Sequence, residues 1–350
     1  MESFQHQFQQ LDGPAEQLRW LTQHRFLGVL DLLVERGLIS TATQRLAAPL
    51  VAKRGRVPPW QLDQERRVLA GLVAAGVPSL ALKGCLLAYL VYPAPDQRWR
   101  SDLDVLVAPA ALERARAALE SLGFEPMWRV AGGTPIDQES WLLRRDRRRF
   151  VLDLHWAMRK HPLLRDRLNF DEQWRVAVEL PALAPGVRGQ APIHALLNAS
   201  LHWFDGIYAE PQPLGWLLDQ DLLWRRLDDG ERRQLALLAD ERGVAGLLGE
   251  SLRMTADFLA TPIPPAFLDD LSRAGRDQRA TRLIRIGRSP ARAYAYALWC
   301  EPGLRRKLHR LTNSLFPPAA HMRERFPEGS RLGLPGLYLR RWFRRWPRAG

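Results

Sequence analysis

Apolar residues recur at every third or fourth position along residues 14–70. This spacing places them on one face of a helix, so it predicts amphipathic helices. The recurrence continues through residues 62–75 and stops at Gly76, a residue type that often follows the last turn of a helix. We therefore expect a helical lead-in over residues 1–60. Its repeating residues include Leu18, Leu21, Phe26, Leu30 and Leu33.

Between residues 77 and 123 the pattern alternates between strands and helices. Residues 77–82 form a short apolar run typical of a strand, and the proline-free stretch 84–92 predicts a short helix. In residues 101–107 carboxylates alternate with apolar residues, which is the period of a strand. Pro109 then opens a helical segment that we expect to end at Gly123.

Three further runs predict the rest of a sheet. Residues 124–130 are expected to form a strand, and residues 141–143 and 150–156 a hairpin. Five arginines surround Asp146 in the turn, where a solvated charged turn is the default interpretation and nucleic-acid contact the alternative. The fold predicted for residues 61–180 is α/β (α+β), a mixed sheet with packed helices.

Proline and glycine separate the second half of the chain. Residues 181–192 contain both and predict a boundary, after which helical periodicity returns through about Leu271. We expect a helical domain over residues 190–290 and a C-terminal tail over residues 301–350. Prolines 317, 318, 327 and 335 interrupt the tail.

The composition narrows the class of protein. Of 350 residues, 46% are apolar, enough for ordinary globular cores. Two cysteines, Cys85 and Cys300, are too few for a disulfide framework or a thiolate zinc cluster. No apolar run approaches the roughly 20 residues of a membrane-spanning helix, and the polar N-terminus lacks a secretory signal pattern. We expect a cytoplasmic protein without a transmembrane segment.

Positive charge is concentrated near the C-terminus. Of a net charge of +13, residues 301–350 contribute twelve Lys or Arg against three Glu, or +9. Residues 332–348 interleave arginines with aromatic and aliphatic residues, a mixture that binds anionic surfaces. We predict that this tail contacts nucleic acid or an anionic membrane, and an inert tail is the alternative.

The candidate chemistry begins with two carboxylates on one predicted strand. Asp102 and Asp104 project to the same side, because successive side chains on a strand alternate between its faces. Holding two like charges together is unfavourable without a counterion. Mg²⁺ is suited to this role, since it prefers one or two carboxylates together with substrate phosphate oxygens. The pair therefore predicts a metal site for phosphate chemistry.

A third acid, Asp153, lies in the apolar run 150–156 and shares a strand face with His155. If this strand lies beside the first, Asp153 completes a two-metal arrangement and is the best candidate for general base. Lys83 and Gly84, between a predicted strand and helix, offer a cation and backbone N–H groups to a triphosphate.

These residues resemble the nucleotidyltransferase superfamily, which includes DNA polymerase beta and the antibiotic nucleotidyltransferases, and within it a branch of uncharacterised bacterial nucleotidyltransferases. The similarity covers about residues 60–275. The first motifs that carry it are Leu82-Lys83-Gly84, Tyr92-Pro93, and Arg98 to Val107 with the sequence RWRSDLDVLV. The others are Leu122-Gly123-Phe124, Val151-Leu152-Asp153-Leu154-His155-Trp156, Leu201-His202-Trp203 and Leu217-Leu218-Asp219.

The resemblance implies transfer of a nucleoside monophosphate from a nucleoside triphosphate, with ATP as the expected donor, to an unidentified acceptor. It implies that Asp102, Asp104 and Asp153 are the catalytic carboxylates and bind Mg²⁺ or Mn²⁺. Nucleotide contacts are implied for Lys83, Gly84, Cys85, Arg98 and Ser101, and substrate-site positions for His155, His202 and Asp219. One departure is that Cys85 follows Gly84 where the wider superfamily has Gly-Ser or Gly-Gly, so Arg98 is expected to supply the missing phosphate contact.

Several alternatives stay open. The chain could be a non-catalytic nucleotide- or nucleic-acid-binding protein with a degenerate nucleotidyltransferase fold. Cys85 is more readily a small apolar residue than a nucleophile. His155 either acts on substrate or bonds a neighbour at the sheet edge, and His194 and His202 are better explained by packing. Asp219 and Asp221 either line the cleft or face solvent.

Overall fold

One hydrophobic core extends through most of the molecule. The computed structural model describes residues 2–127, 138–158, 161–205, 213–286, 289–317, 319, 322, 323, 326 and 333–344. Within them, Phe4 near the N-terminus, Leu103 in the sheet and Leu283 in the second half belong to the same buried cluster. The division of the chain into separate domains therefore stays a prediction.

A seven-stranded mixed sheet lies at the centre, which confirms the predicted α/β class. β2 pairs parallel with β5 and β1 pairs parallel with β7, while the other neighbours are antiparallel. The strand order is β3-β4-β5-β2-β1-β7-β6. The strands are β1 (Ser79–Ala81), β2 (Asp102–Val107), β3 (Glu125–Pro126), β4 (Gln138–Arg145), β5 (Arg148–His155), β6 (Val178–Glu179) and β7 (Arg188–Gly189).

The β4–β5 hairpin ends in a two-residue turn, Asp146 and Arg147. Both residues have positive φ, 50° and 62°, as the type I′ turn that suits a twisted hairpin requires. The arginines around this turn are exposed, in agreement with a solvated turn. β3 is shorter than the strand predicted over residues 124–130, of which residues 128–130 lie outside the described part of the chain.

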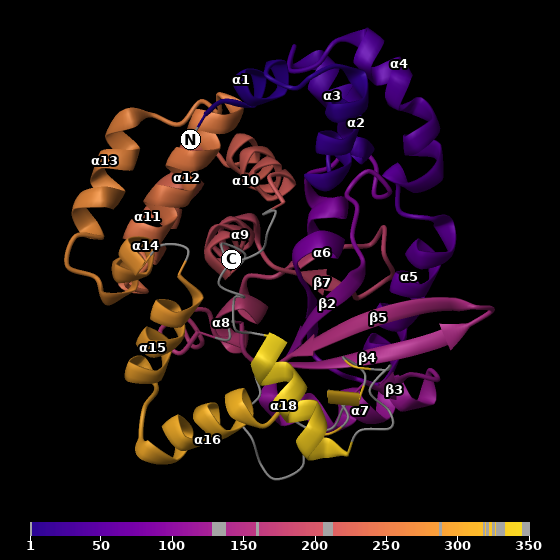
Figure 1. The fold of residues 1–350 in the computed structure, drawn as a ribbon, viewed down its shortest axis with the longest axis vertical. Coiled ribbons are helices and arrows are strands. Elements are labelled where there is room, and N and C mark those ends of the chain that lie inside the picture. The colour runs from indigo at the N-terminus through magenta and orange to yellow at the C-terminus, as the bar shows by residue number, and fades with distance from the viewer. Residues whose placement is uncertain are drawn as a thin grey trace.

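Helices precede the sheet and follow its strands. The predicted helical lead-in is confirmed and occupies the top of the view in Figure 1. It comprises α1 (Phe4–Gln9), α2 (Pro14–Gln23), η1 (Leu27–Val29), α3 (Leu30–Glu35), α4 (Thr41–Leu50) and η2 (Val51–Gly55). The helices of the sheet region are α5 (Pro59–Ala74), α6 (Lys83–Leu90), η3 (Pro109–Ala111), α7 (Leu112–Ser121) and α8 (Phe170–Arg175).

The second half is helical, as the periodicity predicts, and no described helix is long and apolar enough to span a bilayer. The lead-in packs on this half, since the rings of Phe4 and Phe258 lie 5.7 Å apart. The helices of the second half are α9 (Pro192–Asp205), α10 (Gly215–Arg226), α11 (Asp229–Glu241), α12 (Ala245–Leu259), α13 (Pro265–Ala274), η4 (Arg279–Thr281), α14 (Arg282–Ile286) and α15 (Pro290–Cys300).

Two segments carry more structure than the sequence indicates. Residues 181–192, expected only to separate two units, include β7, which pairs with β1 and lies inside the sheet, next to the edge strand β6. In its described residues the tail includes the amphipathic helices α16 (Leu304–Leu315) and α18 (Leu334–Arg344), which lie at the end of the molecule opposite α1–α4 (Figure 1). Pro335 is no obstacle to α18, because proline is tolerated in the first turn of a helix.

Candidate active site

The pairing of β2 with β5 brings two of the predicted carboxylates together. Asp104 is the register partner of Asp153, and the next facing position of β5 is His155. Side chains paired across neighbouring strands lie on the same face of the sheet. The structure thus confirms that the two strands are neighbours. His155, however, lies inside the sheet and not at its edge, since β5 is flanked by β4 and β2.

One oxygen of Asp104 has two close polar partners. Its Oδ1 accepts hydrogen bonds from Lys83 Nζ at 2.5 Å and lies 2.8 Å from His155 Nε2. Burial would raise the pKa of Asp104, but the Lys83 charge and the two hydrogen bonds outweigh it and hold that pKa well below the ordinary value. Burial and then the Lys83 charge lower the pKa of His155. The site therefore contains a carboxylate fixed in its charged form.

Lys83 reaches Asp104 from a strained position between β1 and α6. Its φ of +45° is unusual for a residue with a side chain, and such strain costs on the order of 1–3 kcal/mol. Gly84 follows because a side chain there would contact Arg100, with Arg100 Cβ only 3.1 Å from the added carbon. The junction holds the lysine toward the carboxylates at the expense of local backbone stability.

Asp153 is held by two residues that the sequence analysis did not single out. Ser140 Oγ donates to its Oδ1 at 2.6 Å and Gln138 Nε2 donates to its Oδ2 at 3.1 Å. Ser140 is its register partner on β4, and both residues lie on the face of Asp153 because they are two positions apart. Extending the strand alternation back from Trp141 would have revealed them. These bonds fix the orientation of the carboxylate.

Asp102 lies at the more exposed end of the same strand face. Burial, and then the charge of Asp104, raise the pKa of Asp102 to about 6, and Asp153 acts in the same direction. Ligand atoms of Asp104, Asp153 and His155 lie within 4.8 Å of one another. The crowded carboxylates and their short separations fit a divalent cation, which would relieve the repulsion that raises this pKa.

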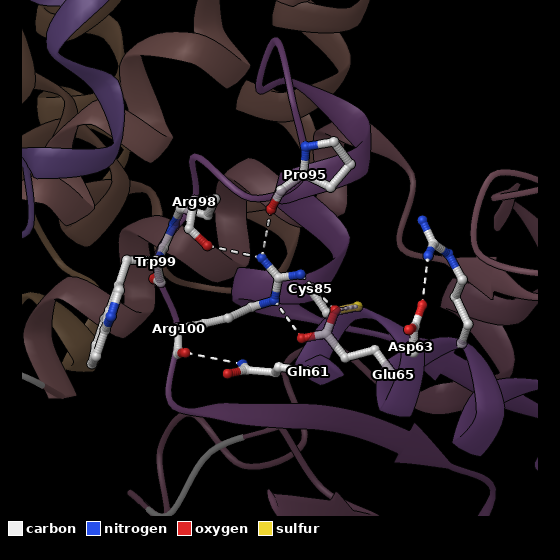
Figure 2. Close-up of polar contacts among 9 residues, drawn as sticks. Gln61, Asp63, Glu65, Cys85, Pro95, Arg98, Trp99 and Arg100 are labelled. Atoms are coloured by element: carbon white, nitrogen blue, oxygen red, sulfur yellow. Dashed lines mark hydrogen bonds and ion pairs between the residues drawn. The ribbon is translucent and has the colours of Figure 1, made fainter. Parts of the chain in front are cut away.

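A buried ion pair supports the segment that leads into β2 (Figure 2). Arg100 donates from Nε and Nη2 to the two carboxylate oxygens of Glu65 on α5, at 2.6 and 2.5 Å. Its backbone oxygen accepts from Gln61, and its Nη1 donates to the Pro95 and Arg98 carbonyls. The pair is almost fully excluded from solvent. It fixes residues 95–100 directly before the carboxylate strand.

Cys85 belongs to this buried support. Its thiol lies 3.8 Å from Glu65, and burial, followed by the Glu65 charge, raises the pKa of the thiol well above its ordinary value. A buried neutral thiol is a poor nucleophile, which favours the interpretation as a small apolar residue. Any nucleotide contact of Cys85 would have to come from its backbone.

A second buried ion pair joins the sheet region to the helical half. Arg98 donates from Nε and Nη2 to the two oxygens of Asp219, each at 2.7 Å, and Tyr92 donates to Asp219 at 2.7 Å. Nη1 of Arg98 donates to the Trp99 carbonyl. Every nitrogen of this guanidinium therefore has a protein partner, so a role in positioning suits Arg98 better than a phosphate contact. Asp221 is also buried, and neither aspartate faces solvent as one alternative supposed.

Replacing Tyr92 with phenylalanine is expected to lower the free energy of unfolding by about 2 kcal/mol, because a buried charged acceptor loses one donor. Chemical unfolding of both proteins measures the difference. The matched control is Tyr294→Phe, which removes a hydroxyl bonded to a neutral carbonyl, that of Arg310. It should cost about 1 kcal/mol or less. Equal losses in the two variants would contradict a special contribution from the Asp219 bond.

The site opens into one cavity of about 740 Å³ that extends into the helical half. Its lining includes all the predicted site residues except Cys85. His202 packs against Trp216 with ring centres 4.4 Å apart, as expected of packing, yet both rings line the cavity. His194 is buried elsewhere, 3.5 Å from Glu172. The predicted site residues that line the cavity are Lys83, Gly84, Arg98, Ser101, Asp102, Asp104, Asp153, His155, His202 and Asp219.

The contact of the basic tail with an anionic surface stays a prediction. Residues 345–348 lie outside the described part of the chain. In the part that is described, α16 exposes Leu304 and Leu308 on one face, with Arg305 and Arg306 also exposed. This arrangement is typical of helices that lie on anionic surfaces.

Two comparisons with known proteins bear on the site. The family model described as "Uncharacterised nucleotidyltransferase" matches residues 59–260, more than half of the chain. The matched region contains β1–β7, all three predicted carboxylates and Lys83. The comparison with curated proteins gave no match.

Proposed function

The chain belongs to the family of uncharacterised nucleotidyltransferases, and from that premise we propose that it transfers a nucleoside monophosphate from a nucleoside triphosphate to an acceptor. The observation that carries the proposal is the register of β2 with β5, which puts Asp104 beside Asp153 at a cavity that also receives Lys83. ATP is the first donor to test. The predicted cytoplasmic localisation is retained as part of the proposal, since these donors are cytoplasmic metabolites.

Asp102, Asp104 and Asp153 are the proposed holders of Mg²⁺, with Mn²⁺ as the alternative, because hard cations prefer carboxylate oxygens. When bound, the cation would neutralise charge on the phosphates and on the attacking and leaving oxygens. His155 is nitrogen-based and already lies against Asp104, so its proposed role is to orient that carboxylate. These assignments use the fit of the carboxylates described above.

Each remaining side chain of the site has a separate proposed role in the transfer. Asp153 is the proposed general base, which accepts the proton of the acceptor nucleophile while a bond forms between that nucleophile and the α-phosphorus. The bond from the α-phosphorus to the bridging oxygen breaks, and pyrophosphate leaves with the electron pair. Lys83, which keeps N–H donors beyond the one given to Asp104, is the proposed phosphate contact, together with Ser101 and the Gly84 backbone. The ion pair between Arg98 and Asp219 is proposed to position residues 98–101.

The acceptor is proposed to bind where the cavity enters the helical half, near His202 and Asn198. The helical half also contributes apolar side chains to the lining, including Ala195, Ala199 and Phe204. Such a surface fits a small molecule with an apolar part better than a chain of phosphates.

The direct test is incubation of the protein with each labelled nucleoside triphosphate, Mg²⁺ and candidate acceptors. Release of pyrophosphate that EDTA abolishes is the expected result. Nucleotide binding without any turnover, across donors and acceptors, would overturn the transferase proposal. It would favour instead the non-catalytic alternative with a degenerate site.

A further inference from the structure

Arg25 lies outside the family-matched region and contributes a positive charge to the lining of the cavity. It lies in the turn after α2 with φ of +66°, and its N–H donates to the Thr22 carbonyl at 3.2 Å. The Gly215 N–H at the start of α10 donates to the His24 carbonyl at 2.9 Å. A side chain at 215 would lie only 2.7 Å from that oxygen, so the glycine permits the close approach. The turn is thus fixed against the helical half.

The Arg25 guanidinium lies between two indole rings. Its Cζ is 4.9 Å from the ring centre of Trp99 and 5.7 Å from that of Trp216. Stacking on aromatic faces leaves the N–H groups at the edge of a guanidinium able to donate. Arg25 lines the cavity together with Lys83 and Ser101. The rings therefore orient a fork of donors beside the nucleotide end of the site.

Among the described residues, no carboxylate forms an ion pair with Arg25. Burial and then the charge of Arg98 lower the pKa of Arg25, while Asp102 and Asp219 oppose the shift. The carboxylate of Asp219 already forms an ion pair with Arg98. Across the described residues, the Arg25 side chain makes no hydrogen bond or ion pair. Partial burial of a cation without such a partner is costly, and a bound anion would remove that cost.

We propose that Arg25 binds a terminal phosphate of the donor nucleotide, together with Lys83, as an anion-recognition residue supplied by the N-terminal helices. The inference rests on the proposed function for the identity of the anion. Arg25 lies outside residues 59–260, the part of the chain that the family model matches. Planar guanidinium forks match phosphate oxygens in a way that an ammonium group does not.

The test is calorimetric titration with inorganic tripolyphosphate and Mg²⁺ at physiological ionic strength. Arg25→Met should weaken binding about tenfold to hundredfold. Arg25→Lys, which keeps the charge but loses the fork, should fall between Arg25→Met and the unaltered protein. The matched control is Arg19→Met on α2, whose side chain is exposed and should not affect binding. Thermal unfolding of each variant verifies that it folds.

Tripolyphosphate affinity within about twofold of the unaltered protein in Arg25→Met would overturn the inference, as would an equal loss in Arg19→Met. The readout is independent of turnover. Arg25-dependent binding in a protein that consumes no nucleotide would support the anion site and overturn the transferase proposal. Nucleotide consumption combined with Arg25-independent binding would do the reverse.

Discussion

Replacing Asp104 with asparagine is expected to reduce nucleotide turnover by about a thousandfold or more, equivalent to about 4 kcal/mol of transition-state stabilisation. Asp104 is the carboxylate that lies beside Asp153 and accepts bonds from Lys83 and His155. Asparagine keeps the shape but removes the charge that would hold a cation. Initial rates of pyrophosphate release at saturating donor measure the effect.

The matched control for this substitution is Asp146→Asn in the β4–β5 turn. Asp146 is exposed and has positive φ, a conformation that asparagine tolerates. It should leave turnover within about twofold of the unaltered protein. Asp153→Asn serves as a second test, because Ser140 and Gln138 can still bond the amide. If Asp104→Asn folds and turns over nucleotide like the control, the carboxylate assignment is wrong.

The largest effect on stability is expected at Glu65. Glu65→Gln should lower the free energy of unfolding by about 3–5 kcal/mol, because it leaves the buried Arg100 charge without a counterion. Urea unfolding followed by circular dichroism measures the loss. Glu113→Gln is the matched control: Glu113 pairs with Arg116 at the surface, where its side chain is 84% exposed. Such a pair contributes about 1 kcal/mol or less.

A double variant separates the ion pair from general packing. In Glu65→Leu with Arg100→Met neither charge of this pair remains, so the loss should be smaller than in Glu65→Gln. A loss in Glu65→Gln no larger than in Glu113→Gln would show that Arg100 finds another partner or water. Turnover in the double variant should still decrease, because Arg100 also anchors the Pro95 and Arg98 carbonyls before β2.

The local elements of the catalytic sheet could be predicted from the sequence. Alternation in residues 101–107 and 150–156 fixed which faces Asp102, Asp104 and Asp153 share, because side-chain direction on a strand depends only on position. The pairing of the two strands did not follow from that pattern. It depends on contacts between residues 49 positions apart in the chain, which only the folded sheet defines.

Partners of charged groups were the least predictable part of the site. Arg98 was expected to meet phosphate, but Asp219, 121 positions later, occupies its guanidinium. Nothing in the sequence indicated that Glu65 is buried and paired, because one acidic residue on an amphipathic helix is ordinarily solvated. Arg25 was equally hidden, because a left-handed arginine between two indole rings has no sequence pattern. Burial and long-range contact decide the roles of such residues.

The origin of the cavity walls bears on how this protein could evolve. The carboxylates lie in the family-matched region, whereas Arg25 comes from the segment before it and Leu283, Tyr294 and Ala297 from the segments after it. Mutation at either end of the chain can therefore reshape what the cavity admits without altering β2 or β5. New specificities can arise while the inherited sheet is left intact.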